Sequence, residues 1–399
     1  MMLTISFGAL HSTMFSVNKI NSLKIKLNTI MRHNILKLQS LFIAGLLFAM
    51  FGMTACNGGG SNTSGSDSTS MGSSADKEIL GAGSSFDNPL FSKMFSEYDQ
   101  QNGVKVNYQS VGSGAGIQQL TSQTVDFGAS DAPMTSSQES TAGTPVLHIP
   151  ITCGAVVISY NLPEVKDTLM FTPSVLADIY LGNIKKWDDP KIAAINKGVK
   201  LPSTPIVIAH RSDGSGTTAI FTSYLSKVSD DWKTKVGSST SVNWPAGIGG
   251  KGNEGVSGVV KQTPGGIGYI ELAYALQNKM PYAKMQNKSG NFIVPTIAST
   301  SASANVQLPA DGKVWITDTD APDGYPITGF SWVLLYKEQK YHSRSLAKVT
   351  NMLKMLEWMI HDGQQYGAAL SYAPLPSAAV TVGDNLLKSA TYDGKQILQ

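Results

Sequence analysis

The sequence predicts an α/β protein whose ordered part divides into two lobes. From Glu78 onward, short apolar runs that fit buried strands alternate with longer helical patterns. This alternation is typical of parallel sheets covered by helices on both faces. About 320 residues follow the low-complexity stretch, which is more than one hydrophobic core comfortably holds, so two lobes are the natural division.

The elements follow from this pattern in order along the chain. Strands are expected at residues 104–108, 146–149, 155–160, 206–209 and 266–270, and helices at 89–101, 173–181, 217–228 and 255–262. The C-terminal third adds two longer helices, near 345–362 and 377–390. No repeat of 20–50 residues is visible, which argues against solenoids and propellers. Ligands of such sheets bind outside the carboxyl ends of strands, often between lobes.

The first 55 residues are a distinct segment with five basic and no acidic side chains. Arg32 and Lys37 precede an apolar run from 41 to 53, which is shorter than the roughly 20 residues that span a bilayer as a helix. The run fits the core of a signal peptide. Residues 1–55 are therefore predicted to be a signal peptide with an N-terminal extension, and Met31 is the expected functional start.

Cys56 lies where cleavage is expected, directly after Thr54 and Ala55. Small residues before such a Cys resemble a bacterial lipobox, and this resemblance implies that Cys56 carries a diacylglycerol. The alternative is an ordinary signal peptide that contains a Cys by chance. The lipobox implies an exported protein that is lipid-anchored in the periplasm or at the outer face of a membrane. Residues 57–76 are mostly Gly, Ser, Thr and Asn, so they are predicted to be a flexible linker.

Charge and cysteine content narrow the class of partner. Beyond residue 55 the chain has 26 basic and 28 acidic side chains, so it is nearly neutral and no nucleic-acid partner is expected. Any anion site must therefore be local. Cys153 is the only Cys after Cys56, and its apolar surroundings favour a core residue over a nucleophile.

Three turns rich in glycine and hydroxyl groups each lead from an expected strand into an expected helix. They lie at residues 81–86, 112–116 and 211–217. A helix N-terminus presents unpaired N–H groups and partial positive charge, and glycines let a ligand approach the backbone closely. One such turn alone is more often a capped helix, but three in one chain favour an anion site.

Two charged residues stand out beside these turns. Arg211 is the only Arg between Arg32 and Arg344, and its position in the third turn suggests a planar, bidentate donor. The alternative for Arg211 is a surface ion pair with Asp213. Asp131 follows a strand expected at 125–130 and precedes Ala132-Pro133, where a turn residue is the ordinary interpretation.

Six segments make a specific resemblance, and they occur in order along most of the mature chain. GAGSSFDNP, VNYQSVGSGAGIQQL, TVDFGASDAP, YLGNIKKWDDP, RSDGSGTTAIFTSYL and NWPAGIGGKGNEGVSGVV resemble the phosphate-binding component of bacterial high-affinity phosphate ABC transporters. The resemblance implies the two-lobed periplasmic-binding-protein fold, type II-like, which closes like a hinge on a ligand held between the lobes. It also implies a set of phosphate contacts, carried over residue by residue: Ser85, Phe86 (through its N–H), Ser113, Asp131, Arg211, Ser215, Gly216 and Thr217.

The same resemblance implies that Asp213 holds Arg211 in place. The second turn departs from the family pattern, because Gly114 and Ala115 replace the usual Ser and Gly. A side-chain contact from position 114 is therefore lost.

Signals for an enzyme are absent from the sequence. The glycine-rich run 247–252 follows a Trp-Pro turn instead of a strand, and no P-loop motif occurs. Ser215 lacks the G-x-S-x-G pattern. The histidines after residue 55 show no metal-ligand spacing, so neither a metal nor another cofactor is expected.

These points predict a binding protein that delivers inorganic phosphate to the permease subunits of an ABC transporter. Lobe 1 is expected to contain residues 77–152 and 324–399, and lobe 2 residues 153–323. Segments near 150–154 and 323–328 would flex on closure. The protein is expected to be a monomer. The alternatives are a secreted phosphatase-type enzyme and a binder of another oxyanion such as sulfate or molybdate.

Overall fold

The structure is a computed structural model that describes residues 74–399. These residues belong to the second of two compact units of the chain, Ser70–Gln399. The first unit, Met1–Thr69, lies outside the described residues, and so do the predicted signal peptide and Cys56. Only the end of the predicted linker is described. There the structure departs from the prediction, because Ser74–Lys77 forms a 3-10 helix whose Asp76 carbonyl accepts a hydrogen bond from Asn351 Nδ2 (3.0 Å).

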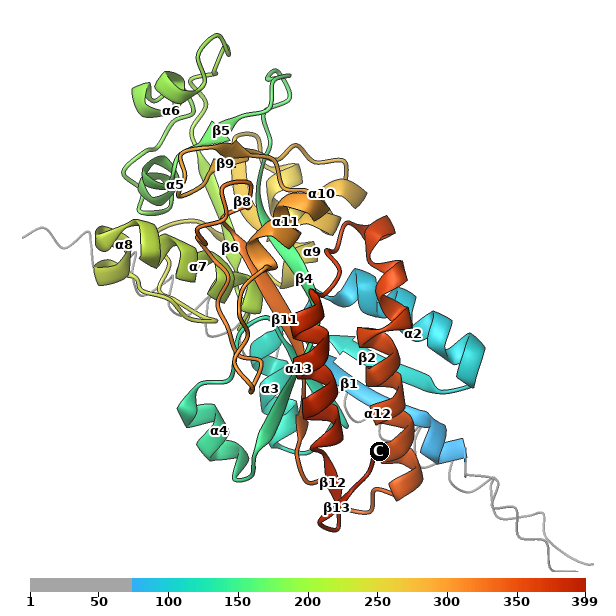
Figure 1. Cartoon of the computed structure of the whole chain (residues 1–399). Helices are drawn as coiled ribbons and strands as arrows, with labels where there is room; N and C mark the ends of the chain where they lie inside the picture. Colours follow the sequence, from blue (N-terminus) through green and yellow to red (C-terminus); the bar gives the residue numbers. More distant parts are fainter. Residues whose placement is uncertain (1–73) are drawn as a thin grey trace, which may run out of the picture. The chain divides into compact units, whose positions relative to one another are not determined.

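An eight-stranded sheet runs through the second unit (Figure 1). In spatial order its strands are β2 (Lys105–Ser110), β1 (Glu78–Gly83), β3 (Phe127–Ser130), β11 (Thr328–Tyr336), β4 (Val146–Tyr160), β8 (Gly266–Glu271), β6 (Val207–Arg211) and β7 (Ile248–Gly250). Pairing is parallel among β2, β1 and β3 and among β8, β6 and β7. It is antiparallel where β11 meets β3 and β4 and where β4 meets β8. The expected parallel pairing is thus confirmed at both flanks and wrong at the centre.

Strand β4 replaces two separate strands that were expected at 146–149 and 155–160. Its 15 residues stay continuous through Pro150, which lacks an N–H group, because the register with β11 shifts between Ser331 and Trp332 opposite this point. β4 pairs with β11 up to Ala155 and with β8 from Val156 onward. It therefore belongs to both halves of the sheet.

Helices cover both halves of the sheet (Figure 1). They are α2 (Asn88–Asn102), α3 (Ser113–Thr121), α4 (Ser136–Ala142), α5 (Pro173–Tyr180), α6 (Pro190–Ile195), α7 (Gly216–Val228), α8 (Asp230–Lys235), α9 (Gly252–Gln262), α10 (Leu272–Gln277), α11 (Ile297–Ala304), α12 (Leu346–Ile360) and α13 (Ser377–Lys388). The six helices expected from the sequence are all present, with ends that differ by a few residues. Among the residues described, no helix combines the length and apolar character needed to cross a bilayer.

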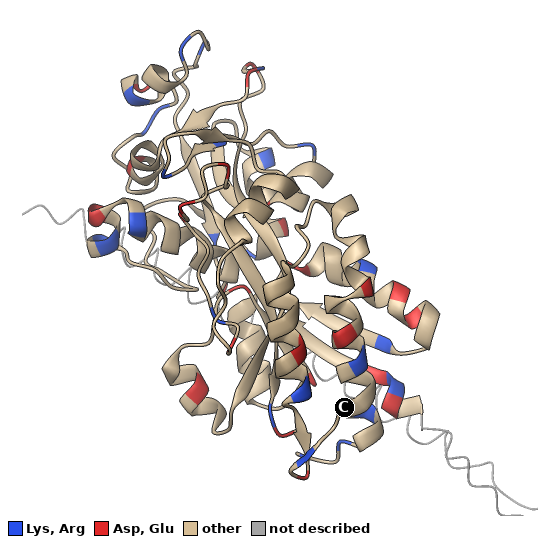
Figure 2. Ribbon diagram, in the orientation of Figure 1, with Lys and Arg blue, Asp and Glu red and all other residues tan. Residues whose placement is uncertain are grey.

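Smaller elements complete the second unit. A three-stranded sheet joins β10 (Phe292–Ile293), β9 (Lys284–Gln286) and β5 (Met170–Phe171), and a hairpin joins β12 (Thr391–Tyr392) to β13 (Lys395–Gln396). Two 3-10 helices, η2 (Asp362–Tyr366) and η3 (Ala368–Leu370), follow α12. In Figure 2 basic and acidic positions are interspersed over helices and loops, and the central strands carry few of them.

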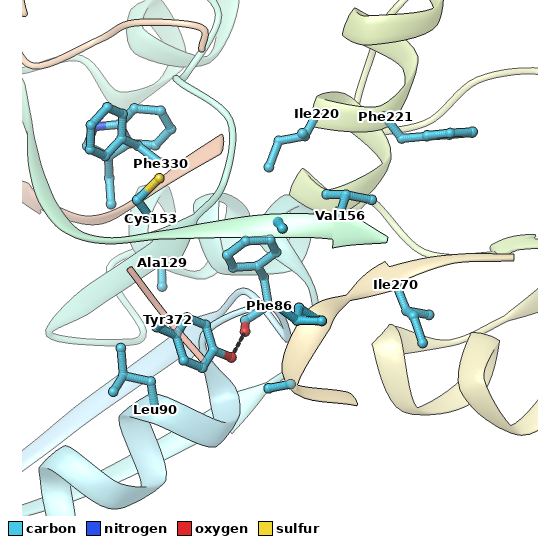
Figure 3. Close-up of a cluster of buried hydrophobic side chains, with 14 of the residues drawn as sticks. Phe86, Leu90, Ala129, Cys153, Val156, Ile220, Phe221, Ile270, Phe330 and Tyr372 are labelled. Atoms are coloured by element: carbon cyan, nitrogen blue, oxygen red, sulfur yellow. Dashed lines mark hydrogen bonds between the residues drawn. The ribbon is translucent and has the colours of Figure 1, made fainter. Parts of the chain in front are cut away.

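The core surrounds the middle of β4 (Figure 3). Cys153 is fully buried there near Phe330, and burial raises the pKa of its thiol, so the expected core role of Cys153 is confirmed. On another side of β4, the hydroxyl of Tyr372 donates to the carbonyl of Phe86 (2.6 Å). This bond fixes the backbone of the first predicted turn, which directly precedes α2.

Candidate functional site

The three predicted turns meet in space. Two of them come from the β1–β2 half of the sheet and precede α2 and α3, and the third follows β6 and precedes α7. Gly114 N–H donates to the Gly214 carbonyl (2.9 Å), which joins the second turn to the third. Asn253, at the start of α9, donates to Ser85 in the first turn. Residues from both halves of the sheet thus form one cluster.

This cluster is closed off from water. The side chains of the predicted site are each at most 4% exposed: Ser85, Phe86, Ser113, Asp131, Arg211, Ser215 and Thr217. Polar groups buried to this degree need partners, because an unpaired buried donor or acceptor is costly. Their partners therefore show what each group can still do.

The hydroxyls of the cluster are held as donors. A hydroxyl has two acceptor lone pairs and a single hydrogen to donate. Ser85 Oγ accepts from both the backbone N–H and the side-chain amide of Asn253 (3.1 and 3.0 Å). Ser113 Oγ accepts from the N–H groups of Gly216 (3.0 Å) and Asp131 (3.3 Å). In both serines the two lone pairs are occupied, so the hydroxyl can only donate its hydrogen.

Two hydroxyls at the start of α7 are placed in the same way. Ser215 caps the helix by accepting from Thr218 N–H (3.0 Å), as a serine at this position should. Thr217 Oγ1 accepts from Asn253 Nδ2 (3.2 Å) and from Arg211 Nη1 (3.4 Å). Both hydroxyls can therefore donate.

Arg211 is bound by Asp213 through two hydrogen bonds, from Nε (2.8 Å) and from Nη2 (2.5 Å). Asp213 also accepts from Gly252 N–H (3.0 Å). Burial alone would raise the pKa of Asp213, but these hydrogen bonds and the charge of Arg211 hold it below its usual range. The ion pair foreseen as the alternative exists, yet the Arg211 side chain is only 2% exposed, so it is not a surface pair. Asp213 directs the remaining edge of the guanidinium toward Thr217.

Asp131 is a buried carboxyl that contacts several elements, and so it is more than a turn residue. Its Oδ1 accepts from Ser84 and from Ser331 on β11 (2.8 Å). Its Oδ2 faces Gly216, where an added Cβ would lie only 2.4 Å away. Burial raises the pKa of Asp131 to about 6, although the hydroxyl hydrogen bonds and the charge of Arg211 oppose this rise.

Two expected backbone donors have partners in the protein. Phe86 N–H donates to Ser84 Oγ (2.9 Å), and Gly216 N–H donates to Ser113 Oγ. The site residues implied by the resemblance are therefore brought together, but these two N–H groups point at hydroxyls of the cluster itself.

Sequence reasoning missed several members of the cluster. Ser84 lies next to Ser85 in the first quoted motif, and Asn253 lies in the last quoted motif, from which no site residue was chosen. Ser331 lies in β11, which was not predicted, and no motif signals it. Tyr274 was also missed, although its hydroxyl donates to the Ser85 carbonyl (2.6 Å).

The donor set suits an oxyanion that keeps a proton. Hydroxyls and one guanidinium can donate to anionic oxygens, while Asp131 can accept from a ligand O–H. Among the residues described, no group of three or more His, Cys, Asp or Glu side chains could hold a metal ion.

Comparison with known proteins first defines the class. The family model of the PBP superfamily domain matches residues 67–357. Two solved phosphate-binding proteins share the fold at low identity. One is a high-affinity periplasmic protein solved with phosphate (20% identity, TM-score 0.60), and the other comes from Stenotrophomonas maltophilia (16%, TM-score 0.58). Each likeness covers 76% of this chain and 92% of the other. The predicted α/β, two-lobed fold class is thereby confirmed.

Curated relatives are much nearer in sequence. The phosphate-binding protein PstS of Xylella fastidiosa is 45% identical over 303 residues, which are 75% of this chain and 82% of the relative. PstS of Pasteurella multocida is 45% identical over 306 residues, 76% and 87% of the two chains. The chain belongs to the PBP superfamily and, within it, to the PstS family of phosphate-binding proteins. This is a family of binding proteins, and the prediction that the chain is not an enzyme is confirmed by this membership.

Proposed function

We propose that this protein captures inorganic phosphate outside the cytoplasm and delivers it to the permease subunits of an ABC transporter. The observation that carries the proposal is the buried cluster in which Arg211 and the hydroxyls of Ser85, Ser113 and Thr217 can only donate, and in which the Ser215 hydroxyl can also donate, next to one carboxyl that can accept. Phosphate offers anionic oxygens to the donors and an O–H to the carboxyl. Membership of the PstS family supports the same ligand.

In this proposal each residue of the cluster has one role. The hydroxyls of Ser85, Ser113, Ser215 and Thr217 donate to phosphate oxygens, and Arg211 adds the guanidinium edge that faces Thr217. Phe86 and Gly216 contribute their N–H groups by exchanging the hydroxyl contacts that they make within the protein. Asp131 accepts the hydrogen of the ligand, and Asp213 keeps Arg211 oriented.

The lobes and the anchor are part of the same proposal. Lobe 1 would contain residues 77–152 and 324–399, and lobe 2 residues 153–323. The change of partner along β4 at Ala155 and Val156, and the Val156 N–H bond to the Ile327 carbonyl (2.8 Å), support hinges near these boundaries. Cys56 would carry the lipid that keeps this exported, monomeric protein at a membrane.

Calorimetric titration of the purified protein with phosphate, arsenate, sulfate and molybdate tests the ligand. The proposal predicts tight binding of phosphate, binding of arsenate because it also keeps an O–H at neutral pH, and rejection of sulfate and molybdate. Preferential binding of sulfate or molybdate would contradict it and favour the other oxyanion.

A further inference from the structure

The carboxyl of Asp87 lies close to that of Asp131, and the hydroxyl of Ser331 contacts both of them. Ser331 Oγ lies 2.5 Å from Asp87 Oδ2 and 2.8 Å from Asp131 Oδ1. Both are hydrogen-bond distances, yet a serine hydroxyl has only one hydrogen. If both carboxyls were ionised, one of these contacts would bring two oxygen atoms together with no hydrogen between them. One of the two carboxyls therefore supplies a proton.

The surroundings decide which carboxyl holds this proton. Asp131 Oδ1 also accepts from Ser84, whose own oxygen accepts from Phe86 N–H (2.9 Å), and the charge of Arg211 favours its ionised form. Asp87 is fully buried, and its Oδ1 makes no hydrogen bond in the structure. An ionised carboxylate buried in this way would be very costly. The proton therefore belongs on Asp87 Oδ2.

The hydrogen bonds then run in one direction. Asp87 donates to Ser331, Ser331 donates to Asp131, and Ser84 donates to the same Asp131 oxygen. We propose that Asp87 is the proton-bearing partner of Asp131, and that its proton makes Asp131 an obligatory acceptor that selects oxyanions carrying an O–H. This inference rests on the proposed function for its ligand, but the position of the proton does not depend on any ligand.

The titratable groups around Asp87 come from several elements and agree with this assignment. Asp131 follows β3, Glu271 ends β8, Tyr108 lies on β2, and Tyr372 follows η3; each interacts electrostatically with Asp87. Burial first, and then the negative charge of Asp131, raise the pKa of Asp87 well above its usual range. Burial likewise raises the pKa of Glu271, and its Oε1 also makes no hydrogen bond in the structure, so we expect Glu271 to be a second neutral acid nearby.

Infrared spectroscopy tests the proton directly. Protonated carboxyl groups absorb infrared light at a different frequency from carboxylates. At pH 7 the wild type should therefore show acid C=O absorption from Asp87 and Glu271. We expect Asp87→Asn to remove one component and Glu271→Gln the other. If Asp87→Asn leaves the acid absorption unchanged, Asp87 does not hold the proton.

Unfolding equilibria give an independent readout. Native Asp87 keeps a proton that it loses on unfolding above pH about 4. The folded state then binds one more proton than the unfolded state, so stability falls as pH rises. The ratio of the wild-type unfolding constant to that of Asp87→Asn should therefore grow up to tenfold per pH unit above pH about 5. Asp99→Asn, an exposed change on α2, is the matched control. A ratio for Asp87→Asn that stays constant with pH would overturn the assignment.

Titrations with phosphate and sulfate test the effect on selectivity. The amide of the Asp87→Asn variant can still donate to Ser331, so this variant should bind phosphate within about threefold of wild type and still reject sulfate. Ser331→Ala removes the hydroxyl that donates to Asp131, so Asp131 can take up a proton and donate it to sulfate. This variant should therefore bind sulfate at least tenfold more tightly than wild type. If Ser331→Ala rejects sulfate as strongly as wild type, the Ser331 hydroxyl does not set selectivity. If the wild type does not bind phosphate at all, the proposed function fails, while the infrared and unfolding results still decide the proton.

Discussion

Three of the four hydroxyls of the candidate site are held as donors because N–H groups occupy both of their lone pairs. Ser85 depends on Asn253, and Ser113 depends on Asp131 and, before the ligand binds, on Gly216. Such preorganisation reduces what the protein must reorder on binding, because the donors already have their direction. At this scale the site is a set of oriented hydrogen-bond donors next to one acceptor, the Asp131 carboxylate.

Arg211→Lys tests the planar donor. Lysine keeps the positive charge but cannot both hold Asp213 with two parallel bonds and reach toward Thr217. We expect phosphate binding to weaken by about 1.5–3 kcal/mol for each charged hydrogen bond that is lost. Calorimetry on the variant measures this directly, and an affinity within about threefold of wild type would place the site elsewhere.

At the scale of elements, two strands and three helix starts position the site. Residues from β3 and β11 bring Asp131 and Ser331 together, while α7 begins at Gly216 against them. Gly216 is needed for this approach, because a Cβ there would lie 2.6 Å from Ser113 Oγ as well as 2.4 Å from Asp131 Oδ2. The start of α7 can therefore meet the other half of the sheet only if this residue has no side chain.

Gly216→Ala should prevent this approach. The added methyl group would force the start of α7 away from Asp131 and Ser113, so we expect phosphate affinity to fall at least a hundredfold. Gly258→Ala on α9 is the matched control, because its Cβ would meet no atom within 4 Å. Calorimetry with both variants decides the point. If both variants bind phosphate as tightly as wild type, the close approach of α7 to Asp131 and Ser113 is not needed for binding.

At the scale of the whole second unit, hydrogen bonds join the two halves of the sheet around the candidate site. Tyr274, on α10, lies within 2.6 Å of the Ser85 carbonyl and 2.8 Å of Glu254 Oε1. Together with the Asn253 bonds to Ser85, this ties the first turn to the α9–α10 region. These contacts break if the halves separate, so they contribute to the closed state.

Tyr274→Phe removes one of these ties and nothing from the donor set. A hydrogen bond of this kind contributes about 0.5–1.5 kcal/mol, so phosphate affinity should fall about threefold to tenfold. The dissociation rate of phosphate, measured by stopped flow, should rise by the same factor. Tyr392→Phe, whose hydroxyl instead bonds the Arg344 carbonyl (2.8 Å), should leave that rate unchanged. If phosphate dissociates from Tyr274→Phe at the wild-type rate, the Tyr274 hydroxyl does not help to hold the two halves together.

The anchor also belongs to this scale. If Cys56 is acylated, Cys56→Ser should leave an uncleaved precursor or release the protein from the membrane fraction. Phosphate binding should survive, because residues 74–399 contain the whole candidate site. Metabolic labelling with a fatty acid gives the measurement, and a wild type that takes up no label would exclude the lipid.

The sequence could predict the turns but not what joins them. Glycine and hydroxyl patterns mark the three helix starts, and these turns contain every phosphate contact that was chosen except Asp131. Ser331 could not be found in this way, because it lies in an apolar strand 244 residues from Asp87 and 200 from Asp131. The central antiparallel pairing was missed for a similar reason, since β11 pairs with strands far away in the chain and carries no local signal of direction.

Asp131→Asn, titrated with phosphate and with sulfate, tests the central claim most directly. At neutral pH phosphate carries at least one O–H, whereas sulfate has none and would face the Asp131 carboxylate with lone pairs alone. Sites built around such a hydrogen bond reject the analogue that lacks it by about 10⁴–10⁵. The Asn amide can donate instead, so the variant should bind phosphate with modest change and gain measurable sulfate binding. If wild type binds sulfate comparably to phosphate, or if the variant rejects sulfate as strongly as before, Asp131 does not select the ligand.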